Sequence, residues 1–481
     1  MPALHNPSSP PPSYEAVTSY RNGNSIDSGD KRQQCSRLMK ITSNGRPYSK
    51  DFLELFSTMV ISTNFSRNRY RFSYVENSCT LLQLLSTLEN LQLSQVNRIK
   101  SRCGSKVLKS TTKFTIPKTA AKCLCNTFLN ARLLQIVNNP SARKFSNEKC
   151  LLQLTRKGYS VVSEFLQHNG HNSQAELYAS KWNHSAPVIV SISRFSSTDQ
   201  ILKDSSFCEM LLVRMLGSVH EIGKSKNPLL VPVYSVSSPS PKDSLSKVTK
   251  YQMFGIDIAE WLMCNTMLLD WSEMETVASD LLIHSYIAYE NNSETPLKFS
   301  YAKGVSYFLT GKGIATLGWT KNVSNNKLIN KINEVEKGST NKEILETILR
   351  KPNLQTYFFE FLKKNFCDEN QRFYSEVCEF NDYFSHANET NDHEAIRESF
   401  AHACGIYNCF LSSNAPNAVN LPSDLYEKIT NHMALAMEVE PLNEWLQLIH
   451  ILLLEAQTAV LDLMAGDSLL KFLELNGGLG I

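Results

Sequence analysis

Apolar residues recur at helical spacing through residues 341–475, and a stripe of this period is the buried face of an amphipathic helix. One set covers two adjoining helices, and a second set steps by three and four residues along one long helix: Leu345, Ile348, Leu349, Leu354, Phe358, Phe361 and Leu362, then Leu446, Ile449, Leu453, Ala456, Val460 and Leu463. The spacing of Thr340 and Glu343 is that of a capping box, which predicts a helix beginning at Asn341. We expect Gly466 to end the long helix and Asp467 to cap the next one. These patterns predict an all-α bundle.

Two earlier blocks alternate helix-like and strand-like patterns. In the first, helices are predicted over 48–61 and 119–136, and a strand over 149–155 that turns at Gly158. In the second, the predicted elements are helices over 207–219, 255–264 and 274–287, a hairpin over 299–309 and a turn over 311–313. Three helices followed by a β-hairpin is the winged-helix plan. We therefore predict winged-helix (α+β) modules over 46–168 and 190–320.

The remaining segments have no apolar periodicity. Residues 1–40 are rich in Pro and Ser and are predicted to be a disordered tail. Residues 235–250, rich in Ser, Pro and Lys, are predicted to be a loop inserted in the second module, and 321–340 a linker. The expected fold is multi-domain and mainly α, with the bundle over 341–475.

The tail contains the tetrapeptide Pro11-Pro12-Ser13-Tyr14. Two prolines favour an extended polyproline conformation, and Pro11, Pro12 and Tyr14 could enter the aromatic groove of a WW domain. A WW-domain ubiquitin ligase is the partner that this motif suggests. The alternative is a plain linker.

Charge divides the chain, although its formal net charge is only +3. Residues 341–481 hold 9 Lys and Arg against 21 Asp and Glu, and residues 1–340 hold 40 against 25. Residues 98–122 contain eight basic residues and no acidic one, which fits either a solvated loop or a patch for an anionic membrane or an acidic receptor tail. The candidate contact residues are Arg98, Lys100, Arg102, Lys106, Lys109 and Lys113.

Several classes of protein are disfavoured. The 12 cysteines are scattered without a CxxC pair or zinc-like spacing, so we expect reduced thiols and no metal. The histidines lack a partnered nucleophile motif, and no glycine-rich phosphate loop is present, so no active site or cofactor of its own is expected. The chain opens without a hydrophobic run, and Glu455 and Asp462 interrupt the apolar stretch 445–464, which favours a core helix and a soluble, intracellular protein.

Three polar patches lie at the joints of the predicted bundle, over 366–370, 415–421 and 463–472. In order and spacing they resemble the RGS domain, the module that speeds GTP hydrolysis by heterotrimeric G-protein α subunits. The resemblance implies seven Gα-contact residues: Glu369, Asn370, Asn420, Leu463, Asp467, Ser468 and Lys471. It also implies that Asn420 reaches the catalytic glutamine of Gα and that Asp467 accepts from switch I. Taken singly, these residues also fit helix caps and turns.

Two positions depart from the family pattern. The family often has an acidic residue where this chain has Asn365, and usually arginine where it has Lys471, and lysine loses the planar fork of arginine. We expect these changes to narrow the choice of Gα without abolishing binding.

Residues 255–262 and 278–287 resemble a DEP domain, and the first block resembles the divergent DEP-like module of fungal RGS proteins. That resemblance implies tethering to the cytoplasmic tail of a G-protein-coupled receptor. In length and layout the chain resembles fungal RGS proteins of the mating-pheromone pathway.

The resemblance implies a GTPase-activating protein that acts on GTP- and Mg-bound Gα without a cofactor of its own and desensitises receptor signalling. Its expected location is the cytoplasm, peripheral at the plasma membrane, with a nuclear pool left open. One alternative is a scaffold that binds a receptor or Gα without speeding hydrolysis. Another, less favoured, is a winged-helix nucleic-acid-binding protein; no nucleic-acid partner is expected.

Overall fold

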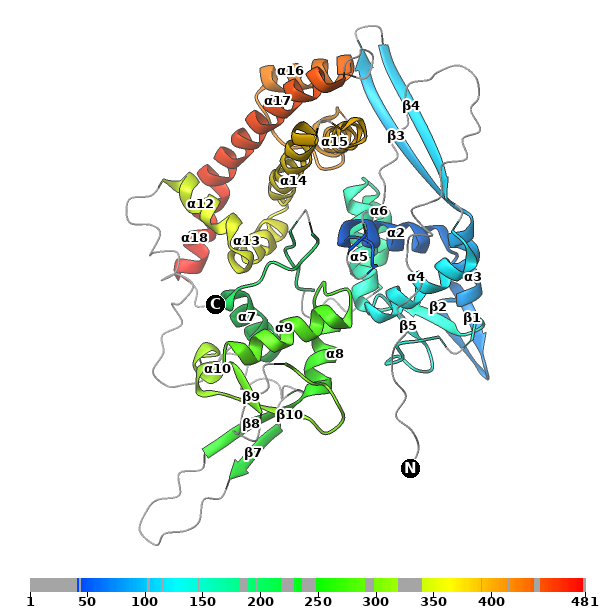
Figure 1. Cartoon of the computed structure of the whole chain (residues 1–481), viewed down its shortest axis with the longest axis vertical. Helices are drawn as coiled ribbons and strands as arrows, with labels where there is room; N and C mark the ends of the chain where they lie inside the picture. Colours follow the sequence, from blue (N-terminus) through cyan, green and yellow to red (C-terminus); the bar gives the residue numbers. More distant parts are fainter. Residues whose placement is uncertain are drawn as a thin grey trace.

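Buried apolar side chains form three clusters in the computed structural model of the chain (Figure 1). The structure describes residues 41–42, 45–101, 104–114, 116–145, 147–181, 189–195, 198–217, 229, 231–235, 248–289, 298–318, 340–390, 392–413, 415–436 and 442–478. The clusters lie within residues 52–175, to which Leu269 is added, within 190–317, and within 344–472. Each cluster is the core of one part of the molecule. The predicted tail and linker, and most of the predicted inserted loop, lie outside the described residues.

The first part combines a small antiparallel sheet with helices. Its elements are α2 (Ser49–Ser62), β1 (Ser66–Tyr70), β2 (Ser73–Thr80), α3 (Leu81–Glu89), α4 (Lys118–Asn130), β5 (Leu134–Ile136), β6 (Leu151–Leu154), α5 (Arg156–His168) and α6 (Asn172–Ala179). The strand order is β1-β2-β6-β5. Between α3 and α4 the chain makes a long hairpin, β3 (Leu91–Ser101) and β4 (Gly104–Phe114), which extends to α16 (Ser423–Ala436) of the bundle (Figure 1).

The second part repeats this connectivity without the long hairpin. Its elements are α7 (Ser205–Leu216), β7 (Val231–Ser235), β8 (Val248–Phe254), α8 (Gly255–Asn265), α9 (Trp271–Ile283), β9 (Ile287–Tyr289), β10 (Ser306–Leu309) and α10 (Gly311–Thr316), with strand order β7-β8-β10-β9. If the four strands of each sheet are counted in chain order, both sheets have the order first, second, fourth, third. Both parts are therefore winged-helix modules of one architecture.

A threonine–glycine pair follows the last strand of each module. The Thr155 hydroxyl accepts from the Gly158 amide at 3.0 Å, and Thr310 accepts from Gly313 at 3.0 Å, so each threonine caps the following helix. A Cβ at Gly158 would lie 2.2 Å from the Leu133 carbonyl oxygen. Only glycine fits at this position, because the first turn of α5 (Arg156–His168) lies so close to the backbone of Leu133.

The third part is an all-α bundle, as predicted. Its helices are α12 (Asn341–Arg350), α13 (Pro352–Lys364), α14 (Glu369–Thr390), α15 (His393–Ile406), α16, α17 (Leu442–Leu463) and α18 (Leu469–Gly478). Two π-helical segments, η1 (Tyr407–Leu411) and η2 (Met464–Ser468), continue α15 and α17. The predicted capping box is confirmed, because Thr340 and Glu343 exchange both hydrogen bonds and α12 begins at Asn341.

Several predicted boundaries are wrong. The predicted helix 119–136 ends at Asn130, and its last residues form strand β5. The predicted turns at Gly158 and at 311–313 are instead first turns of α5 and α10, because the preceding threonines cap them. The predicted helix 274–287 ends at Ile283, and its last residue opens β9, the partner of β10 in the hairpin.

One helix among the described residues, Leu442–Glu474, is long and apolar enough to cross a membrane. Its inward side chains Leu446, Ile449 and Leu453 are about 1% exposed and belong to the core of the bundle. These contacts are those of a core helix, as predicted.

The two winged-helix modules meet through buried charges. The Arg46 guanidinium lies 2.8 Å from Asp199 and 3.0 Å from Glu273, with Arg46 only 6% exposed. The buried Lys157 ammonium of α5 donates to the Met263 carbonyl at 3.0 Å. A buried ammonium needs such acceptors because desolvation is costly.

Candidate functional site

A strained turn joins α13 to α14. The Cys367 amide donates to the Leu362 carbonyl at 3.1 Å and the Phe366 amide to the Lys363 carbonyl at 3.3 Å, the two bonds of a Schellman motif. Phe366 occupies the left-handed position of that motif, with φ 54°, where glycine is usual. Its side chain is 91% exposed. The turn therefore pays a conformational cost and presents an aromatic ring to solvent.

Glu369 and Asn370 begin α14 directly after this turn. The Asn370 amide group donates to the Cys367 carbonyl at 3.3 Å and to the Glu369 carboxylate at 3.0 Å, and Asn370 is buried. Burial raises the pKa of the Glu369 carboxyl, and Asp368 raises it further, while Arg372 lowers it. Asn370 thus holds the turn from inside, and Glu369 lies half-buried at its edge.

The helix α17 continues through η2 into α18, so the prediction that Gly466 ends it and Asp467 caps the next helix is wrong. The wider π-helical turn absorbs the extra residue, and such segments are frequent at functional sites. Asp467 instead lies exposed and pairs with Lys471 at 2.7 Å. Leu463, at the end of α17, is 43% exposed, and Ser468 is buried.

The turn and η2 are brought together because α13 and α18, which adjoin them, pack against one another: the ring centroid of Phe472 lies 5.2 Å from that of Phe358 and 5.4 Å from that of Phe361. Burial raises the pKa of the Cys367 thiol, and a hydrogen bond with Ser468 opposes this rise, while Glu369 and Asp467 raise the pKa further. The Cys367 thiol is therefore close to residues of both the turn and η2. The structure brings six of the seven predicted Gα-contact residues to this end of the bundle: Glu369, Asn370, Leu463, Asp467, Ser468 and Lys471.

Asn420, the seventh, lies exposed in the loop between η1 and α16. Its loop is fixed by the Asn417 amide, which donates to the Cys409 carbonyl at 3.0 Å, and by the Val419 amide, which donates to the Phe410 carbonyl at 3.1 Å. The Phe410 ring packs edge-on to Phe373 of α14, with centroids 5.6 Å apart. The loop of Asn420 is thereby attached to the first turns of α14.

The basic candidates of the first module lie mainly in strands. Arg98 and Lys100 belong to β3, and Lys106, Lys109 and Lys113 to β4, so this part of the run is a hairpin, and its binding to a membrane or receptor tail stays a prediction. Four other candidates, Arg102, Pro11, Pro12 and Tyr14, lie outside the described residues.

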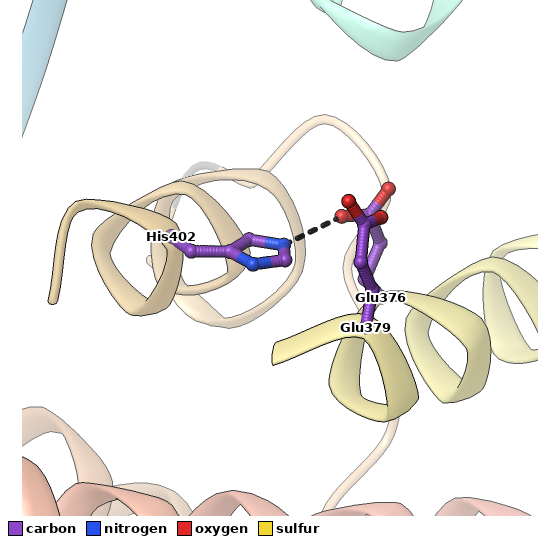
Figure 2. Close-up of side chains that lie close together, drawn as sticks. All are labelled: Glu376, Glu379 and His402. Atoms are coloured by element: carbon purple, nitrogen blue, oxygen red, sulfur yellow. Dashed lines mark hydrogen bonds and ion pairs between the residues drawn. The ribbon is translucent and has the colours of Figure 1, made fainter. Parts of the chain in front are cut away.

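One group of side chains in the described part of the chain could offer three ligands to a metal, Glu376, Glu379 and His402 (Figure 2). The imidazole Nε2 of His402 lies 3.2 Å from Glu376. The Lys50 ammonium of α2, however, lies 2.7 Å from Glu376 and 3.3 Å from Glu379. Because the Lys50 ammonium is already paired with both carboxylates, this is an ion-pair cluster between the first module and the bundle.

Sequence reasoning missed Phe366 and the charges that face the first module. Arg372, Glu376 and Glu379 follow the spacing of one face of α14, and Asp368 continues that face one turn earlier. This charged stripe was the available signal, but a charged stripe is equally typical of a face in solvent.

Comparison with known proteins agrees with this architecture. Residues 344–475 match the regulator of G protein signaling domain, and residues 51–180 match the fungal-differentiation regulator winged helix domain. The chain is 28% identical to "Developmental regulator flbA" of Emericella nidulans over 484 aligned residues, which cover 92% of this chain and 64% of that protein. The chain therefore spans less than two thirds of that relative.

The winged-helix match covers the first module and names a fungal domain rather than DEP, so the DEP resemblance of both modules stays a prediction. The second match covers the bundle whose polar turn, loop and π-helical segment are described above. Residues 344–475 are therefore an RGS domain with a winged-helix domain on its amino-terminal side, and over most of its length the chain resembles the fungal protein flbA.

Proposed function

We propose that this chain is a GTPase-activating protein for a heterotrimeric G-protein α subunit. The observation that carries the proposal is that the 366–370 turn and η2 are brought together, by the packing of α13 on α18, in a bundle that matches the RGS domain. Gα subunits carry their own arginine and water-orienting glutamine, so an activator need supply no nucleophile or base. It has to hold mobile switch loops in the arrangement of the transition state.

The described residues suit that task. Asn370 and Ser468 are buried and Asn370 holds the Cys367 carbonyl, while Asn420 and Asp467 present polar groups at the surface. Asp467 is paired only with Lys471 in an exposed ion pair, and such pairs are weak. The Asp467 carboxylate can therefore exchange Lys471 for a switch-loop amide at little cost.

The test is single-turnover GTP hydrolysis by purified, GTP-loaded fungal Gα subunits, with and without the full chain. We expect Asn420→Ala to lower the stimulation about tenfold or more, because the variant loses a contact made with the switch loops in the transition state. Asn431→Ala, an exposed asparagine on α16, is the matched control and should keep full activity. Full activity of Asn420→Ala would contradict the assigned role. A chain that binds Gα without any stimulation would favour the scaffold alternative.

For the winged-helix modules we propose recruitment to the membrane, through the cytoplasmic tail of a receptor and through anionic lipid. The charge of the first 340 residues and the basic residues of β3 and β4 support this, because each basic group near an anionic surface adds about 1 kcal/mol. The implied location is the cytoplasmic face of the plasma membrane. Sedimentation with phosphatidylserine vesicles tests it: loss of binding on replacing Lys106, Lys109 and Lys113 by glutamine is expected.

The remaining partners stay proposals of the same kind. Three further proposals rest on the sequence alone. They are a role in the response to mating pheromone, a WW-domain ubiquitin ligase that binds Pro11, Pro12 and Tyr14, and a nuclear pool of the protein. Steeply salt-dependent binding to DNA would instead favour the nucleic-acid alternative.

A further inference from the structure

The first winged-helix module packs against the RGS bundle beside the segments that carry the Gα-contact residues. The helix α5 lies beside α14 of the bundle (Figure 1). Besides the Lys50 cluster and the β3–β4 hairpin, the module contacts the bundle through the carboxyl-terminal half of α5 and the residues that follow it, and these contacts reach both the α13–α14 corner and the loop of Asn420. This contact is not needed for the core of either part.

Glu164 of α5 joins the two helix ends that bracket the strained turn. Its carboxylate lies 2.9 Å from Arg372, in the first turns of α14, and 3.3 Å from Lys363, in the last turn of α13. Arg372 in turn lies 2.6 Å from Asp368. One carboxylate thus links the residues on either side of the turn that presents Phe366 and Glu369.

These charged groups are partly buried, so water screens their attraction less than it would at an exposed site. The Arg372 side chain is 13% exposed and that of Glu164 27%. Burial disfavours ionisation of Glu164, but Lys363 and Arg372 lower the pKa of its carboxyl well below the ordinary value. Charge-assisted hydrogen bonds of this kind are stronger than neutral ones.

The end of α5 also holds the loop of Asn420. The Asn417 amide group donates to the His168 carbonyl at 3.0 Å, which satisfies a carbonyl left free at the helix terminus. Gly170, with φ 76°, faces Pro416 so closely that a Cβ there would lie 3.1 Å from the proline Cβ. The loop is therefore fixed three residues before Asn420.

The contact leaves the predicted Gα-facing groups open. Asn420, Asp467 and Lys471 remain exposed, and the hydrogen bonds described from the winged-helix module go to other residues of the bundle, among them Arg372, Glu376 and Asn417. A module that blocked the surface would cover these residues. A module that supports the surface would instead contact neighbouring residues, as the first winged-helix module does here.

We propose that Glu164 and the carboxyl-terminal end of α5 are positioning elements for the Gα-contact surface. Through Arg372 and Lys363 they hold the α13–α14 turn, and through Asn417 they hold the loop of Asn420, in the shape that binds the switch regions. This inference rests on the proposed GTPase-activating function. Preorganisation of this kind improves binding by reducing the ordering that association would otherwise cost.

The test compares full-chain Glu164→Gln with Glu176→Gln, a matched exposed glutamate on α6. Two readouts are used: single-turnover GTP hydrolysis by a purified, GTP-loaded Gα, and hydrogen exchange of peptides covering 365–371 and 415–421. We expect Glu164→Gln to lower the stimulation about fivefold or more and to speed exchange in the 365–371 peptide, since charge-assisted bonds are lost. Glu176→Gln should match the parent protein in both.

Three further variants show whether the effect passes through the named contacts. The variant Lys363→Gln/Arg372→Gln should lower the stimulation at least as far as Glu164→Gln does, and adding Glu164→Gln to it should cause no further loss, because the carboxylate acts through these two residues. Asn417→Ala should speed exchange in the 415–421 peptide alone.

Unchanged exchange and stimulation in Glu164→Gln would overturn the inference. Stimulation that rises in this variant would also overturn it, because the module would then be an inhibitor. If the parent chain stimulates no Gα tested, the proposed function fails, whereas the exchange readout still tests the positioning contact by itself.

Discussion

At Phe366 a left-handed backbone conformation coincides with an exposed aromatic side chain. A non-glycine residue in the left-handed region costs about 1–2 kcal/mol, and the nearly full exposure of Phe366 means that its ring gains little in burial to offset that cost. Strain that packing does not offset is more typical of a functional site than of a structural turn. We therefore add Phe366 to the candidate Gα-contact residues.

The corresponding prediction concerns Phe366→Gly. Because glycine adopts the left-handed conformation freely, the free energy of unfolding should rise by about 1 kcal/mol, measured by urea denaturation. GTPase stimulation should fall, since the exposed ring is lost.

Asn365→Gly provides the control. Asn365 precedes Phe366 at φ −100°, so glycine brings no relief there and should lower stability by about 0.5–1 kcal/mol. A Phe366→Gly protein that is less stable than the parent, or that keeps full stimulation, would count against this reading of the turn.

At the scale of elements, local chemistry decides what the sequence predicts well. Thr340 and Glu343 predicted the start of α12 correctly, because a capping box is complete within four residues. The predicted turn at Gly158 was wrong because glycine here serves a close crossing of backbone in the first turn of a helix. The π-helical passage at Gly466 also escaped prediction, since apolar period and glycine position fit a helix end equally well.

The close crossing gives a prediction for Gly158→Ala. The added Cβ would meet the Leu133 carbonyl oxygen, so the free energy of unfolding should fall by about 2 kcal/mol or more. Gly405→Ala in α15 is the control: nothing lies within 4 Å of its Cβ, and the stability should rise by about 0.5–1 kcal/mol. Equal effects of the two substitutions in urea denaturation would refute the crossing.

At the scale of the whole molecule, the arrangement of the three parts depends on contacts distant in sequence. The Gα-contact candidates came from a family pattern within one domain. The partners of Arg372 and Glu376, namely Glu164 and Lys50, lie more than two hundred residues away, and no local spacing indicates them. For this reason the RGS segments were predictable and their support by the winged-helix module was not.

This interface should weaken in acid. Burial opposes ionisation of Glu164 and Glu376, but their basic partners lower the pKa of both carboxyls below the ordinary 4.5, so their contribution to stability is complete above that pH and is lost as the pH falls below it. Burial, with Arg372, also lowers the pKa of His168 from 6.5 to about 4. Between these pH values the unfolded chain binds a proton at His168 that the folded chain does not bind, so the free energy of unfolding falls as the pH falls there as well. Stability should therefore decline from about pH 6 toward about pH 3.

Thermal unfolding followed over that pH range measures the effect. The Glu164→Gln protein should show a shallower decline than the parent, because it lacks one of the titrating carboxylates, while Glu176→Gln should follow the parent. Identical pH dependence in all three proteins would contradict the assigned ion pairs.

The central claim is that this bundle favours Gα in the arrangement it adopts during hydrolysis. An activator that works in this way must bind the transition state more tightly than the GTP-bound ground state. The most direct measurement is the affinity of the full chain for Gα carrying GDP and aluminium fluoride, compared with Gα carrying a non-hydrolysable GTP analogue. The account predicts clearly tighter binding to the aluminium fluoride form, and equal affinity for the two forms would contradict it.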